Sequence, residues 1–267
     1  MNSVTTTTTP SPASANLTAL FTIARREVAR IMRIWGQTLV PPAITMTLYF
    51  LIFGKLIGSQ VRDMGGVSYM SFIVPGLVMM SVIQNAYGNI SSSFFGAKFG
   101  RHIEELLVSP MPNWVILLGY VSGGLLRGLM VGAIVLVISM FFTDLSVPHP
   151  LITLLTVLLG ATIFSLAGFI NAVYARKFDD IAIVPTFILT PLTYLGGVFY
   201  STEMLPDWAR TLTHFNPVFY IVNAFRYGLL DKTDVPMWTS FGLMFAFVIG
   251  LGALALFLLK RGTGLRS

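Results

Sequence analysis

Long apolar runs alternate with short polar connections along most of the chain. Six of these runs each have roughly the 20 apolar residues that a helix needs to cross about 30 Å of hydrocarbon. The pattern therefore predicts an all-α membrane protein with six transmembrane helices. They are expected at residues 37–57, 68–92, 114–142, 151–175, 180–200 and 238–259.

A different pattern precedes the first run. Over residues 17–36, apolar side chains recur at helical spacing on one side, and Arg26, Arg30 and Arg33 fall on the other, with Arg25 at the flank. A basic amphipathic helix with Trp and Phe on its apolar side tends to lie in the plane of the membrane interface. We predict such an interfacial helix here, with an ordinary soluble helix as the alternative. Its apolar side consists of Leu17, Leu20, Phe21, Ala24, Val28, Ile31, Met32 and Trp35.

Composition agrees with a membrane protein. Hydrophobic residues make up 55% of the 267 residues, and charged residues only 10%, against roughly 25% in soluble domains. The basic residues lie in short connections rather than on one soluble face, which argues against a nucleic-acid partner. Residues 1–16 are polar and of low complexity, and we predict that they are disordered. The remainder, up to the tail at 260–267, forms one membrane domain at residues 37–259 behind the interfacial helix.

The distribution of Lys and Arg predicts the orientation, because cytoplasmic loops carry an excess of both. The richer side holds Arg25, Arg26, Arg30, Arg33, Lys98, Arg101, Arg176, Lys177, Lys260, Arg261 and Arg266. The poorer side holds Lys55, Arg62, Arg210, Arg226 and Lys232. We therefore expect both termini in the cytoplasm, which requires an even number of spans.

Small residues recur at four-residue spacing in two of the runs. Lipid gives no hydrophobic drive for helix association, so such seams allow the close backbone approach that packing needs. They serve either packing within the chain or contact with a second copy. The seams contain Gly119, Gly123, Gly124, Gly128 and Gly132 in the third run, and Gly242, Ala246 and Gly250 in the sixth.

Signatures of catalysis and metal binding are missing from the sequence. The three histidines lie in separate connections, there is no cysteine, and no Walker-A pattern occurs, so the chain cannot bind ATP by that route. No Asp or Glu lies in the interior of a predicted span, which argues against a carrier coupled to protons or sodium ions. We expect no catalytic site, no metal site and no cofactor in this chain.

One charge lies inside a predicted span. Arg127 is near the middle of the third run, where even mild insertion scales give an arginine a cost of about 2.5–3.5 kcal/mol. It should therefore face the bundle or a wet cavity. Two interpretations remain open: a residue of the transport pathway that meets an anionic or polar cargo, or a structural arginine held by amides. The amides available to it are Gln84, Asn85, Asn89 and Asn171.

The connection after the second run, at about 97–110, mixes apolar and acidic residues. A Ser109-Pro110 pair ends it, because proline disfavours helical geometry in the preceding residue. We predict a short helix at the membrane surface that offers its side chains to a partner, or else a simple connector. The residues concerned are Phe99, Arg101, Glu104, Glu105, Leu106, Leu107, Ser109 and Pro110.

The connection before the last run, at about 201–231, contains two short apolar helical patterns. Pro206 can open the first, which carries Trp208, and Asn216-Pro217 separates the two. Neither is long enough to cross a membrane alone. We predict a re-entrant hairpin that dips into the outer leaflet, with a pair of surface helices as the alternative.

Taken in order, these features resemble an ABC-2 type permease over about residues 20–267. The resemblance rests on the interfacial helix, six spans, the Glu104-Glu105-Leu106-Leu107-Val108-Ser109-Pro110 loop, and a hairpin with Leu205-Pro206, Trp208, Asn216-Pro217, Tyr220 and Arg226. Other runs are similar to a bacterial YadH-like inner-membrane subgroup. These are Phe178-Asp179-Asp180, Pro185-Thr186-Phe187, Leu189-Thr190-Pro191-Leu192-Thr193-Tyr194 and Gly196-Gly197-Val198-Phe199-Tyr200.

The resemblance implies a type V exporter-like fold in the bacterial inner membrane. It implies a homodimer that docks two cytoplasmic ATPase subunits, which bind ATP and Mg²⁺. The segment matching 99–110 would be the coupling helix in the ATPase, and 201–231 would be the re-entrant pair near the outer exit. The conduit would lie between the two copies, walled by spans one, two and five. A secondary carrier or channel and a non-transporting scaffold are the rival functions, and the sequence does not identify a substrate.

Overall fold

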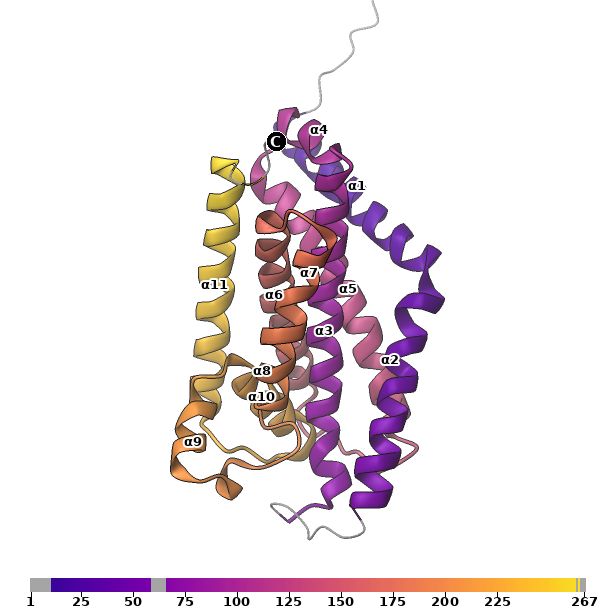
Figure 1. Cartoon of the computed structure of the whole chain (residues 1–267), viewed down its shortest axis with the longest axis vertical. Coiled ribbons are helices and arrows are strands. Elements are labelled where there is room, and N and C mark those ends of the chain that lie inside the picture. Colours follow the sequence, from indigo (N-terminus) through magenta and orange to yellow (C-terminus); the bar gives the residue numbers. More distant parts are fainter. Residues whose placement is uncertain (1–10, 59–65, 263, 265–267) are drawn as a thin grey trace, which may run out of the picture.

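The computed structural model describes residues 11–58, 66–262 and 264, and their regular structure is helical. The helices pack side by side in an elongated bundle (Figure 1). In chain order they are α1 (Pro12–Arg33), α2 (Trp35–Tyr49), the π-helix η1 (Phe50–Ile57), α3 (Tyr69–Phe99), α4 (His102–Val108), α5 (Asn113–Ser139), α6 (Pro150–Tyr174), α7 (Phe178–Val184), the π-helix η2 (Pro185–Leu189), α8 (Thr190–Tyr194), the 3₁₀ turn η3 (Thr202–Met204), α9 (Asp207–His214), α10 (Pro217–Leu230) and α11 (Met237–Arg261).

Five helical segments are long and apolar enough to cross a membrane. They coincide with five of the six predicted spans, which confirms the all-helical class and these five positions. Their bounds are Trp35–Gly54, Tyr69–Phe99, Asn113–Ser139, Pro150–Tyr174 and Met237–Arg261.

The fifth predicted span, 180–200, is wrong at its carboxyl end. Helical structure there runs through α7, η2 and α8 and stops at Tyr194. Gly197 then adopts a φ of 74°, a left-handed conformation that glycine reaches without strain and that turns the chain away. At 1.5 Å per residue the helical run is about 25 Å long, shorter than the hydrocarbon core. A sixth span therefore stays a prediction.

The two ends of the described chain lie at the same end of the bundle. Figure 1 shows the start of α1, the short helix α4 and the end of α11 at one end of the bundle, and α9 and α10 toward the other. This arrangement agrees with an even number of passes along the bundle. Which end faces the cytoplasm stays a prediction from the Lys and Arg distribution.

Helix α3 forms the centre of the bundle. Within its most apolar window 78% of the residues are buried, compared with 17% for α2 and 22% for α11. It packs mainly against α5 and α6, whereas α2 and α11 lie at the edges in Figure 1. The two outer helices therefore leave wide apolar surfaces for lipid or for another chain.

The glycines of α5 serve packing within the chain. A Cβ at Gly119 would lie 2.6 Å from Ile23 Cγ2, and one at Gly123 would lie 2.8 Å from Glu27 Cβ, so α1 crosses α5 at these two glycines. A Cβ at Gly128 would lie 3.2 Å from Ala86 Cβ of α3 and 3.4 Å from Ala161 Cβ of α6. In α11, by contrast, a Cβ at Gly242 or Gly250 would meet no described atom within 4 Å. This second seam is not used by the described part of the chain.

Helix α1 begins earlier than predicted. Ser11 caps it, accepting a hydrogen bond from the Ser14 backbone N–H at 3.3 Å, and Pro12 occupies the first turn. Residues 12–16 are thus helical rather than disordered, while residues 1–10 of the predicted tail lie outside the described residues. Most of the predicted apolar side is exposed, including Leu17 and Trp35, as an interfacial helix requires.

We expect Gly123→Ala to destabilise the protein, because the added Cβ would push α1 off α5. Overpacking of this kind costs about 1–3 kcal/mol. Gly242→Ala is the matched control: it adds the same atom in open space and should be neutral or slightly stabilising, since Ala favours helix over Gly. The measurement is the thermal unfolding midpoint of the purified chain in detergent. Equal midpoints for both variants would contradict the assigned α1–α5 contact.

Candidate functional site

The short helix α4 forms a protruding surface at one end of the bundle. Gly100 caps the carboxyl end of α3. Arg101 then takes a left-handed conformation, with φ of 58°, that redirects the chain into α4. Ile103 is 1% exposed and fixes α4 to the bundle, while Glu104 and Glu105 are exposed. The helix therefore presents acidic side chains outward from a buried apolar anchor.

The end of α4 follows the sequence expectation. Ser109 is extended, with φ of −63° and ψ of 146°, as a residue before proline should be. Val108 is 87% exposed, and Leu106 and Leu107 are half-buried. The predicted helix over 97–110 is divided in the structure, because the residues up to Phe99 belong to α3.

Phe99 does not share the surface of α4. Its ring packs edge-on against Phe178 of α7 with the centroids 5.1 Å apart, and Phe95 packs against the same ring at 5.0 Å. Next to them, Lys98 Nζ donates to the carbonyls of Val173 at 2.6 Å and Ala175 at 2.7 Å, where α6 ends. These contacts fasten the last turn of α3 to α6 and α7.

Glu27 is a buried acid that the sequence analysis missed. It is 1% exposed; its Oε2 accepts a hydrogen bond from Arg30 Nη2 at 2.9 Å, and its Oε1 accepts one from Ser93 Oγ at 2.6 Å. Arg30 also donates to Asn89 Oδ1 at 2.8 Å. Arg30 therefore connects α1 to α3, a contact that the sequence analysis did not predict. A sequence signal existed: Glu27 is the one acid in residues 17–36 and lies three residues before an arginine.

The structure places Arg127 beside one of its predicted amide partners. Its Nε donates to Asn85 Oδ1 at 3.3 Å, and the side chain is half-buried between α5 and α3. Gln84, next to Asn85 on α3, is half-buried. Asn89 is bound to Arg30, and Asn171 donates to the backbone of α7 at 3.4 Å instead. The geometry thus brings Arg127 and Asn85 together and leaves open whether Arg127 meets a cargo.

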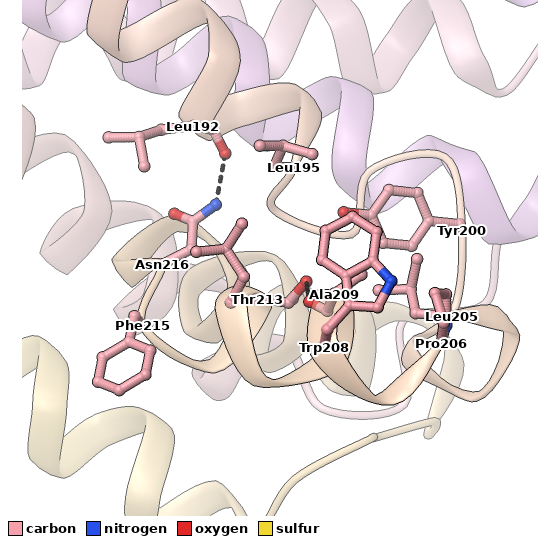
Figure 2. Close-up of a pocket in the computed structure, with 11 residues that line it drawn as sticks. Leu192, Leu195, Tyr200, Leu205, Pro206, Trp208, Ala209, Thr213, Phe215 and Asn216 are labelled. Carbon is pink, nitrogen blue, oxygen red and sulfur yellow. Dashed lines mark hydrogen bonds between the residues drawn. The ribbon is translucent and has the colours of Figure 1, made fainter.

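At the far end, the hairpin is built around Asn216. Its Oδ1 accepts from the Val218 backbone N–H at 3.0 Å and caps α10, while its Nδ2 donates to the Leu192 carbonyl at 2.7 Å, as Figure 2 shows. Pro217 follows in the first turn, and Tyr220 Oη donates to the carbonyl that ends α9, at 2.8 Å. The Asn-Pro break was predicted. The hydrogen bond from Asn216 to Leu192, which attaches the hairpin to α8, was not predicted.

An apolar cavity of about 430 Å³ lies between α8 and α9. Pro206 precedes α9, and Trp208, which is 73% exposed, lies beside Tyr200 at the cavity (Figure 2). Phe215 also lines the cavity and is 81% exposed. The cavity could hold an apolar group, and its walls offer little hydrogen bonding.

Arg226 is buried, although the orientation analysis counted it among the external charges. It is 1% exposed, its Nη2 donates to the Gly197 carbonyl at 2.6 Å, and its guanidinium lies 4.0 Å from the centroid of the Phe72 ring. Gly76, one turn further along α3, approaches Val198 so closely that a Cβ would lie 2.7 Å from its Cα. Arg226 thus clamps the turn after α8 onto both α10 and α3.

We expect Arg226→Ala to lower the free energy of unfolding by about 3 kcal/mol, since it leaves a cavity and removes a charge-assisted hydrogen bond to a backbone carbonyl. Arg210→Ala, on exposed α9, is the control and should change stability little. Thermal unfolding in detergent and protease cleavage near residue 197 provide the measurements. If the two variants behave alike, Arg226 is not the clamp described above.

Comparison with known proteins agrees with this architecture. Residues 18–230 match the family described as ABC-2 type transporter. The chain is 58% identical over 249 residues to the inner membrane transport permease YadH of Escherichia coli (strain K12), covering 93% of this chain and 97% of that protein. It is 25% identical over 205 residues to nodulation protein J of Sinorhizobium fredii (strain NBRC 101917 / NGR234), covering 76% of each. The resemblance stated from the sequence is thereby confirmed, and the chain belongs to the ABC-2 type transporter family.

Proposed function

We propose that this chain is the permease subunit of an ATP-binding cassette exporter in the bacterial inner membrane. It would move a substrate with energy from ATP and Mg²⁺ bound by a separate ATPase subunit. Membership of the ABC-2 type transporter family carries the proposal. The name of the Escherichia coli relative, inner membrane transport permease, supports the proposed membrane location and the proposed role as a permease.

The ATPase would dock on α4, two ATPase subunits to each pair of permeases. Glu104 and Glu105 are exposed on this helix, and Val108 adds an exposed apolar contact beside them. Acidic and apolar side chains on a short, firmly anchored helix suit a basic groove with an apolar floor. The chain itself has no Walker-A pattern, so hydrolysis belongs to the partner.

Helix α3 would transmit the movement of α4 to the outer hairpin. It is a single helix of 31 residues that begins beside the turn clamped by Arg226 and ends one turn before α4. A close-packed helix shifts as a unit, because its neighbours leave no room for it to deform gradually. Nucleotide binding would then bias the bundle between two states through their different contacts with the ATPase.

The second permease copy would pack against α2. This helix is poorly covered, and Ile44 and Leu48 are more than half exposed on it. Tyr49 and Tyr194 share a hydrogen bond of 2.6 Å, which joins α2 to α8 and places both helices on one side of the bundle. A conduit walled by α2, α3 and the α7–α8 segments of two copies would therefore be contiguous. The hairpin of α9 and α10 would dip into the outer leaflet at its exit.

We expect Glu105→Lys to insert normally and to lose transport-linked stimulation of the ATPase, because it reverses charge at the docking surface. Asp207→Lys is the matched control on α9, which is exposed at the opposite end. The measurement is ATP hydrolysis by the co-purified ATPase with each variant in proteoliposomes. Unchanged coupling in Glu105→Lys would refute docking at α4. A secondary carrier or a scaffold would instead yield no co-purifying ATPase.

The orientation has its own test. A fluorescent protein fused after Ser267 should fluoresce in cells, whereas alkaline phosphatase at the same place should be inactive, since the Lys and Arg distribution predicts a cytoplasmic tail. The same pair of reporters fused after residue 234, in the connection before α11, should give the reverse result. Phosphatase activity at the tail would overturn the predicted topology and the docking surface with it.

A further inference from the structure

A second cavity, of about 560 Å³, opens between α1 and the last turns of α3. Its volume falls within the range of small-molecule sites. The ionisable residues on its wall are Arg26, Glu27, Arg30, Arg33 and His102. No role proposed above for α4, the hairpin or Arg127 uses this cavity.

The cavity carries an excess of positive charge. Glu27 is the acid on its wall, and both of its oxygens are already bound, one by Arg30 and the other by Ser93. Arg26 donates at 2.6 Å to the hydroxyl of Tyr120, a neutral group, so its charge stays uncompensated. The side chain of Arg33 forms no hydrogen bond or ion pair within residues 11–58, 66–262 and 264. The charges of Glu27 and Arg30 cancel, so the guanidinium charges of Arg26 and Arg33 remain uncompensated.

A buried donor on the same wall has no acceptor. The Nε–H of Arg30 is inaccessible to solvent and finds no hydrogen-bond partner in the described part of the protein. A buried donor without a partner is unfavourable, so an anion or a bound water is needed there. Guanidinium groups match the oxygens of a phosphate with paired hydrogen bonds, which favours the anion.

The position of the cavity favours a phosphate that belongs to a lipid. Helix α1 leads directly into the membrane helix α2 through a one-residue break at Ile34. Val28, Met32 and Trp35 are exposed near this junction, 40%, 52% and 58% respectively. They lie on the side of α1 opposite the arginines but at the same turns, and exposed apolar side chains with a tryptophan mark the depth at which headgroups meet hydrocarbon.

We propose that this cavity binds the phosphate of an anionic lipid headgroup, held by Arg26, Arg30 and Arg33. The acyl chains would extend along the exposed apolar side chains of α2, which include Ile44 and Leu48. Basic cavities between helices at the membrane surface recognise anionic headgroups in this way. The site requires only that this end of the bundle meets a membrane surface. It is independent of ATPase docking and of transport.

The test uses the full chain, purified in detergent without the ATPase. Phosphatidylglycerol is the probe, phosphatidylcholine with the same acyl chains is the zwitterionic comparison, and inorganic phosphate is the free-anion comparison. Native mass spectrometry measures the retained lipid, and thermal unfolding measures the shift of the midpoint. Arg33→Gln and Arg33→Glu are the test variants, because Arg33 has no internal partner to lose. Arg25→Gln is the matched control: Arg25 is exposed on the same helix and does not line the cavity.

We expect phosphatidylglycerol to be retained and to raise the midpoint of the wild type and of Arg25→Gln. Loss of one charge-assisted bond should weaken its binding about tenfold in Arg33→Gln. Arg33→Glu, which adds a second acid to the wall, should abolish it. Equal responses of the Arg25 and Arg33 variants would overturn the proposal, as would equal retention of phosphatidylcholine. If inorganic phosphate alone reproduces the full shift, the ligand is a free anion and the lipid assignment fails.

Discussion

Close approach of α3, α5 and α6 is the contact on which the rest of the structure depends. Lipid tails are as apolar as leucine, so burying apolar side chains gives little drive for helices to associate in a membrane. Dispersion attraction across tight contacts must supply the drive for the helices to associate. Gly128 of α5 allows this contact with α3 and α6, and Gly168 of α6 lies closer still to the backbone of α3 at Tyr87. The result is a rigid centre to which more exposed helices attach.

Polar links attach the peripheral parts to that centre. Glu27 and Arg30 bind α1 to α3 near one end, and Arg226 binds the turn after α8 to α3 near the other. Each link pairs a charged group with a partner at a fixed position, so it is directional and specific in a way that apolar packing is not. Helix α2 has fewer such attachments and a mostly exposed surface, which makes it the part of the bundle freest to rearrange.

A rigid centre with attached peripheral helices suits the proposed permease function, in which the bundle would change shape without losing its fold. A stiff α3 with one end beside α4 and the other beside the hairpin can carry a displacement along its length, while the buried charges keep its neighbours in register. The lipid site proposed beside α1 would let the surrounding membrane contact α3 as well. The apolar cavity at the hairpin lies at the opposite end and has a different chemistry.

The sequence by itself determined the helical class, the positions of five membrane-length helices, and the breaks at Ser109-Pro110 and Asn216-Pro217. Apolar run length and proline geometry are local properties, and they survive in any packing. Tertiary structure alone decided that Glu27 and Arg226 are buried, which helix meets Gly119 and Gly123, and that α8 stops at Tyr194. Periodicity reports which side of a helix is apolar, but it does not identify the neighbour on that side. A charged residue is therefore read as external until the partner that stabilises it inside is known.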